Sequence, residues 1–75
     1  MSLRYTIRTA ASKTGLSAHT IRAWERRYGA LSPDRTDTNR RLYEEEDLDR
    51  LSLLRGAVEA GHSIGQIAHL ATEDL

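Results

Sequence analysis

The 75-residue chain has no cysteine and no long hydrophobic run, and each absence excludes a class of protein. Without cysteine there are no disulfides and no thiolate metal ligands, which is typical of a reducing, cytoplasmic setting. No apolar stretch approaches the roughly 20 residues that a helix needs to cross a bilayer. A chain this short buries only about 60% of its unfolded surface, which predicts one small domain over residues 1–75. We therefore expect a cytoplasmic protein with no membrane partner.

An excess of one charge is also missing, because eleven basic residues balance eleven acidic ones. The balance averages two unlike halves. Residues 1–43 hold nine basic and three acidic residues, a net charge of +6, whereas residues 44–75 hold two and eight, a net charge of −6. Such asymmetry predicts a polyanionic partner for the basic half. The alternative is that both halves only present solvated charged surfaces.

Two short helices are predicted in the basic half. The first covers residues 7–13, with Thr6 as its N-cap and Gly15 closing it in a left-handed turn. Ser17 is a good N-cap for a second helix, which ends just before Gly29.

The spacing of small and apolar residues in these helices predicts a helix-turn-helix over about residues 6–28. This motif needs a small residue where the two helices cross, a glycine-like residue in the turn and apolar anchors on the second helix. Ala11 lies four residues before Gly15, and Ile21 and Trp24 follow at the positions of the anchors.

The rest of the chain predicts a hairpin and two supporting helices. Residues 33–43 read as two short extended runs, and Asn39 tolerates the positive φ of a tight turn between them. Leucines at helical spacing predict a helix over residues 45–60, and a second follows over residues 63–71, capped by Ser63. The expected fold is mainly α: a winged helix-turn-helix of four helices and a two-stranded β-hairpin.

Apolar residues on the inward faces of these elements form the predicted core. On the second helix, Ile21, Trp24 and Tyr28 fall at i, i+3 and i+7, so they share one stripe. The whole predicted core is Ala11, Leu16, Ile21, Trp24, Tyr28, Leu42, Leu51, Leu54, Ile64 and Ile67.

The opposite face of the second helix, in the stretch TIRAWERRYGAL, is basic. The step of 100° per residue turns His19, Arg22, Ala23 and Arg26 outward, with Arg27 at the margin. Arginine pairs bidentately with guanine or with phosphate, and alanine permits close approach or contact with a thymine methyl. We expect Arg22 to contact the major groove and Arg26 to lie near the DNA backbone. The alternative is an ordinary solvated arginine face.

The hairpin is basic as well, and a basic hairpin beside a helix-turn-helix acts as a wing that grips phosphates or the minor groove. Because Arg40 and Arg41 are adjacent on an extended run, their side chains point to opposite faces. We expect Arg40 to face DNA and Arg41 to form a structural ion pair with Glu25. The predicted DNA contacts are Ser17, His19, Thr20, Arg22, Ala23, Arg26, Arg27, Arg35, Asn39 and Arg40.

Three stretches, TIRAWERRYG, PDRTDTNRRLYEEEDLDRL and GHSIGQIAHL, resemble the DNA-binding domain of MerR-type transcription regulators. The resemblance implies a bacterial regulator that binds double-stranded promoter DNA, with the second helix in the major groove. Asn39-Arg40 stands where many relatives carry Gly-Tyr or Gly-His at the wing tip, so a charged contact replaces an aromatic one.

WERRYG is similar to one subgroup of that family, whose members carry a C-terminal cobalamin-binding region and act as light- or cobalamin-responsive repressors. The resemblance further implies a homo-oligomeric full-length protein, with RNA polymerase or an acidic antirepressor as another partner. The dimerisation helix and effector domain of the family lie outside these residues, so we expect no cofactor in this chain.

Other chemistry is poorly supported by the sequence. His62 and His69 straddle a helix start and lack a third ligand, so no metal site is predicted. Gly61, Ser63 and Gly65 have the spacing of a hydrolase nucleophile elbow, but they follow a helix rather than a strand. We expect no enzyme activity. The rival interpretation is a protein-interaction module whose basic face binds an acidic, DNA-mimicking partner or antirepressor.

Overall fold

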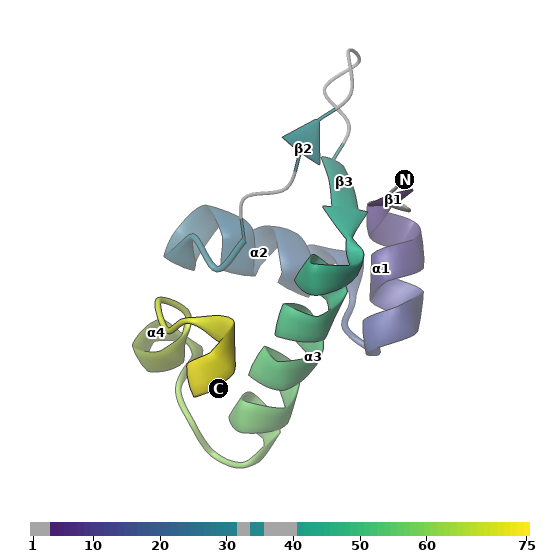
Figure 1. The fold of residues 1–75 in the computed structure, drawn as a ribbon. Coiled ribbons are helices and arrows are strands. Elements are labelled where there is room, and N and C mark those ends of the chain that lie inside the picture. The colour runs from purple at the N-terminus through teal and green to yellow at the C-terminus, as the bar shows by residue number, and fades with distance from the viewer. Residues whose placement is uncertain (1–3, 32–33, 36–40) are drawn as a thin grey trace.

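The computed structural model describes residues 4–31, 34–35 and 41–75. In chain order the elements are β1 (Arg4–Tyr5), α1 (Ile7–Thr14), α2 (Ala18–Tyr28), β2 (Asp34–Arg35), β3 (Arg41–Glu44), α3 (Glu45–Glu59), α4 (Ile64–Ile67) and the 3₁₀ helix η1 (Thr72–Asp74). Figure 1 shows α1 beside α3, with the strands at one end of this pair. α4 contacts both α2 and α3. The expected winged helix-turn-helix is confirmed.

The caps and turn of the helix-turn-helix follow the sequence closely. Thr6 Oγ1 and Ser17 Oγ each accept a hydrogen bond from the backbone N–H three residues on, at 3.3 and 3.0 Å. Gly15 and Gly29 end the two helices with φ of +78° and +61°, a conformation that costs glycine little. The predicted bounds of both helices are therefore confirmed to within one residue.

Arg55 of α3 fixes the turn between α1 and α2. Its Nη1 donates to the carbonyl oxygen of Thr14, at the end of α1, at 3.1 Å. A Cβ at Gly15 would lie 2.3 Å from the same nitrogen, so a larger residue would displace the end of the Arg55 side chain, and the positive φ of +78° favours glycine there independently. α3 thus supports the turn between the two helices of the motif.

The strands form a small antiparallel sheet in the order β1-β3-β2. β2 and β3 are the predicted hairpin strands, paired as Asp34 with Leu42 and Arg35 with Arg41. β1 was not expected, since two residues carry no alternation signal. It pairs Tyr5 with Tyr43, and the Tyr5 hydroxyl also donates to Glu45 Oε2 of α3 at 2.7 Å. The predicted turn at Asn39 lies outside the described residues.

One core joins the helices α1 to α4 and the strand β3. Its buried side chains are Ala10, Ile21, Trp24, Ala30, Leu31, Tyr43, Leu48, Leu51, Leu54, Ile67 and Ala68. Five predicted core residues are among them, and three more, Ala11, Leu16 and Ile64, are half-buried against the cluster.

Two predicted core residues were placed wrongly. Tyr28 is 40% exposed at the last position of α2, where one edge of its ring lies beside Gly65 of α4. Leu42 is half-buried and lies outside the core cluster, whereas its neighbour Tyr43 is fully buried. Strand alternation explains the exchange, since Arg41 and Tyr43 share the inward face of β3.

The fourth helix is shorter than the predicted 63–71. It covers Ile64–Ile67, with Ser63 at the N-cap position but without a side-chain capping bond. The chain leaves α-helical geometry directly after it, since the Leu70 N–H bonds the carbonyl oxygen of Ile67, three residues back, at 3.0 Å. The next free carbonyl oxygen, that of Ala68, accepts from Arg50 Nη2 of α3 at 2.6 Å. The predicted third helix is confirmed, since α3 covers Glu45–Glu59. Among the described residues, no helix is long and apolar enough to cross a bilayer.

Candidate nucleic-acid interface

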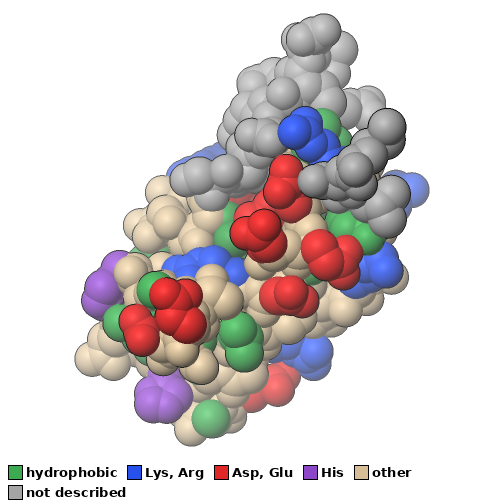
Figure 2. Space-filling view, viewed as in Figure 1, with side chains coloured by type: hydrophobic (Ala, Val, Ile, Leu, Met, Phe, Trp, Pro, Cys, Tyr) green, Lys and Arg blue, Asp and Glu red, His purple; other side chains and the backbone are tan. Residues whose placement is uncertain are grey.

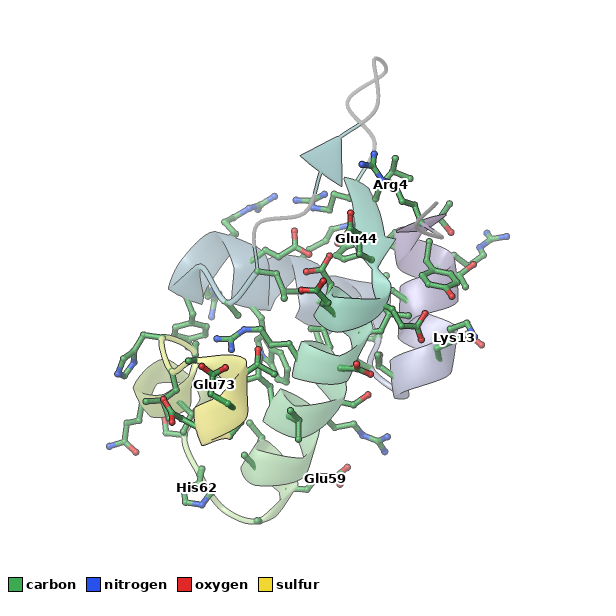
Figure 3. All side chains as sticks on the ribbon, viewed as in Figure 1. Arg4, Lys13, Glu44, Glu59, His62 and Glu73 are labelled. Carbon is green, nitrogen blue, oxygen red and sulfur yellow. The ribbon has the colours of Figure 1, made fainter. Side chains whose placement is uncertain are left out.

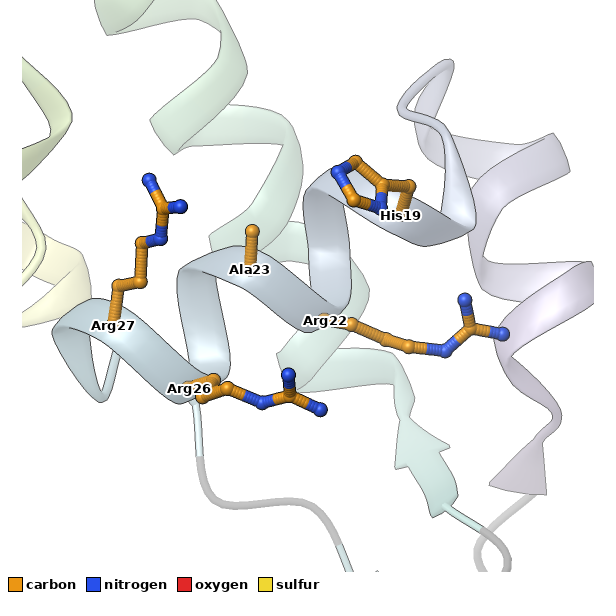
Figure 4. Close-up of a pocket in the computed structure, with 5 residues that line it drawn as sticks. All are labelled: His19, Arg22, Ala23, Arg26 and Arg27. Carbon is orange, nitrogen blue, oxygen red and sulfur yellow. The ribbon is translucent and has the colours of Figure 1, made fainter.

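The outward face of α2 gathers the basic side chains that the helical period predicted. Together they line one surface pocket of about 290 Å³, formed by His19, Arg22, Ala23, Arg26 and Arg27. Figure 4 shows the side chains of Arg22 and Arg26 extending in the same direction, while Arg27 extends in another. The outward placement of all five residues is confirmed, and we name this surface the α2 basic face.

The arginines of this face are available to an external anion. Arg22, Arg26 and Arg27 are all exposed. Within the part of the chain that the structure describes, none of the three pairs with a carboxylate. Three guanidinium groups on one helix face, without internal partners, form a site suited to phosphates and to base edges that accept hydrogen bonds.

Ser17 and Thr20 lie at the N-terminal end of α2, outside the pocket. The Ser17 hydroxyl donates to Thr20 Oγ1 at 2.9 Å and accepts from the Thr20 backbone N–H at 3.0 Å. This network starts the helix and leaves its remaining N–H groups at a positively polarised end, which favours anions. Their role as DNA contacts stays a prediction.

The wing strand β3 is fixed to α2 from the inner side. Arg41 Nε donates to Glu25 Oε1 at 2.8 Å, so the predicted ion pair is confirmed. The Tyr43 hydroxyl donates to Glu25 Oε2 at 2.5 Å, a contact that was not predicted. Burial, followed by this hydrogen bond, raises the pKa of Tyr43 far above its usual value, so the hydroxyl remains a donor. The signal for this contact was the spacing Arg41-x-Tyr43 on one strand face.

The remaining wing residues are less fully described. The backbone of Arg35 lies in β2, opposite Arg41. Its side chain, and the whole of Asn39 and Arg40, lie outside the described residues. Their assignment as DNA contacts stays a prediction.

The acidic residues gather on surfaces other than the α2 basic face. Figure 2 shows acidic side chains over the start of α3 and over η1. Glu45, Glu46 and Asp47 fill the first turn of α3, where the helix dipole stabilises them. At the end of the domain where the sheet lies, Glu44 Oε1 is 3.9 Å from Arg4 Nε. Figure 3 shows both side chains at that end. The charge asymmetry of the sequence is therefore an asymmetry of the surface.

In the described part of the chain, no group of three His, Cys, Asp or Glu side chains could hold a metal ion. His62 and His69 are both exposed. Ser63 lies at the start of α4, and its Oγ would be 3.8 Å from a Cβ added at Gly65.

In sequence, the chain is similar to known transcription regulators. The chain is 36% identical to the transcriptional regulator MlrA of Salmonella typhimurium, over 93% of this chain and 29% of MlrA. It is 41% identical to the transcriptional repressor CarH of Myxococcus xanthus, over 88% of this chain and 22% of CarH. The chain thus spans less than a third of the length of these relatives.

Solved structures of similar fold include a DNA complex. HiNmlR, a MerR family regulator lacking the sensor domain and bound to promoter DNA, superposes with a TM-score of 0.78 at 34% identity, over 88% of this chain and 52% of that one. A MerR family regulator from Bacillus cereus gives 0.80 at 26% identity, over 96% and 58%. The family model for MerR HTH regulatory proteins matches residues 5–74, so the chain belongs to the MerR family.

Proposed function

We propose that this domain binds double-stranded promoter DNA sequence-specifically, with α2 in the major groove and the wing on the backbone or minor groove. The observation that carries the proposal is the α2 basic face, with three exposed guanidinium groups that have no carboxylate partner in the described residues. A further support is the similarity to HiNmlR, whose structure was solved with promoter DNA.

Each predicted contact has a role in this arrangement. Arg22, near the middle of α2, pairs with base edges, because arginine matches the two acceptors of guanine. Arg26 and Arg27, in the last turn, pair with phosphates, and Ala23 lets the helix approach the base pairs closely. The other predicted contacts bind the DNA backbone and so set the position of the domain along the duplex. They are Ser17, His19 and Thr20 at the start of α2, and Arg35, Asn39 and Arg40 in the wing.

We further propose that the domain comes from a repressor of the subgroup with a cobalamin-binding region. The support is the WERRYG stretch, together with 41% identity to two repressors of Myxococcus xanthus, CarH and CarA. In this proposal the full-length protein is a cytoplasmic homo-oligomer, with RNA polymerase or an acidic antirepressor as a second partner. The effector is held outside residues 1–75.

Salt dependence tests the DNA proposal against the rival protein-interaction module. A domain that neutralises about six phosphates should lose roughly 10³-fold in affinity between about 50 and 200 mM salt. Fluorescence anisotropy with a labelled duplex from the chain's own promoter region measures this loss. A scrambled duplex of equal length serves as the control and should bind more weakly at both salt concentrations. Equal binding of both duplexes with a shallow salt dependence would support an acidic protein as the partner.

A further inference from the structure

Glu25 lies on α2 between two arginines of the basic face, yet it does not belong to that face. Its side chain is only 7% exposed. A buried carboxylate is costly unless its oxygens are paired. Here each oxygen has a different donor, Arg41 Nε at 2.8 Å and the Tyr43 hydroxyl at 2.5 Å. Both carboxylate oxygens of Glu25 therefore accept a hydrogen bond from β3.

The two donors come from one face of a single strand. Arg41 and Tyr43 are two residues apart on β3, so their side chains point the same way toward α2. Two bonds to the two oxygens of one planar carboxylate resist both sliding and rotation of the strand. We name these three residues, Glu25, Arg41 and Tyr43, the Glu25 clamp. It ties the strand that carries the wing directly to the helix that carries the basic face.

We infer that Glu25 is a positioning residue, which sets the placement of the wing relative to α2 so that both engage one duplex at once. This inference rests on the proposed function. The phosphates of a duplex stand at fixed spacings, so a wing that shifts relative to α2 loses its contacts when α2 keeps its own. The clamp also removes Arg41 from DNA binding, since its side chain is only 20% exposed and its guanidinium is already paired.

The clamp and simple electrostatics predict opposite signs for Glu25→Gln. The substitution removes a negative charge beside the basic face and releases Arg41 for phosphates, so charge alone would strengthen DNA binding. Loss of positioning would weaken it. Tyr43→Phe changes no charge and removes only one hydrogen bond, so only the positioning role predicts an effect on binding.

The experiment compares these two variants with Glu59→Gln. Glu59 is exposed and makes an ion pair with Arg55 at 3.0 Å within α3, so it controls for losing one paired carboxylate. Duplex binding is measured by anisotropy over a salt series, after circular dichroism has confirmed folding. We expect Glu25→Gln to bind about tenfold more weakly, with a salt slope shallower by about one to two. Tyr43→Phe should bind several-fold more weakly, and Glu59→Gln should not weaken binding.

Amide hydrogen exchange in the free domain tests the clamp without DNA. In Glu25→Gln we expect the amides of β3 to exchange about tenfold faster, while those of α1 stay as in the unsubstituted domain. Unchanged exchange in β3, or a folded Glu25→Gln that binds DNA as tightly as the unsubstituted domain, would overturn the inference. If instead the unsubstituted domain binds no duplex but β3 exchange increases as expected, the clamp holds and the proposed function fails.

Discussion

Replacing Trp24 with alanine should lower the free energy of unfolding by about 3–5 kcal/mol, the usual cost of deleting a buried indole. Trp24 is 8% exposed and belongs to the single core that joins α2 to the rest of the domain. A domain of 75 residues has a total stability of only about 4–11 kcal/mol at typical values per residue. Urea denaturation followed by circular dichroism should therefore show a variant that is mostly unfolded at modest denaturant concentrations.

Tyr28→Ala is the matched control for Trp24→Ala on the same helix. Tyr28 is 40% exposed and packs one side of its ring against Gly65, so its loss should cost about 1 kcal/mol. If Trp24→Ala is no less stable than Tyr28→Ala, the indole is not the anchor of α2.

Arg22→Ala should weaken binding to the promoter duplex by about 1–3 kcal/mol, or about 5- to 150-fold, and relax base preference. Folding should be unaffected, because the side chain is exposed and has no carboxylate partner in the described residues. Titration with duplexes that differ at single base pairs measures both effects. Arg40→Ala, by contrast, should weaken binding to all duplexes alike, because we expect Arg40 to contact the phosphate backbone of the DNA and not the bases.

Arg8→Ala is the control for the loss of one positive charge. Arg8 is exposed on α1, two residues from the fully buried Ala10 and so on the opposite side of that helix. Its loss should change affinity by no more than about twofold through long-range charge alone. An Arg22→Ala variant that binds the promoter duplex with unchanged affinity would show that the outward face of α2 is not the reading surface.

Local signals in the sequence were enough to predict the elements that carry this surface. Thr6 and Ser17 cap their helices as predicted, and Gly15 and Gly29 take positive φ. The 3.6-residue period then placed the arginines of α2 outward, because an amphipathic helix this short has only one apolar stripe. These features depend on residues within about one turn of each other, which is why the sequence alone reveals them.

Contacts between distant residues were harder to predict. β1 pairs with β3, and its Tyr5 hydroxyl bonds Glu45 of α3, forty positions along the chain. Arg50 of α3 bonds the carbonyl oxygens of Ala30 and Ala68, at 2.7 and 2.6 Å, and so joins two segments that follow α2 and α4. Such contacts carry no periodic signal. Arg41 was the exception, since strand alternation placed its side chain on the inward face, toward Glu25.

Chemical-shift mapping of the labelled domain with a promoter duplex shows whether the outward face of α2 meets the DNA. We expect the largest shifts at the amides of α2 and at the side-chain Nε–H groups of Arg22 and Arg26, and little change in the acidic first turn of α3. Large shifts confined to α3 or η1, with α2 unperturbed at saturating duplex, would contradict this expectation.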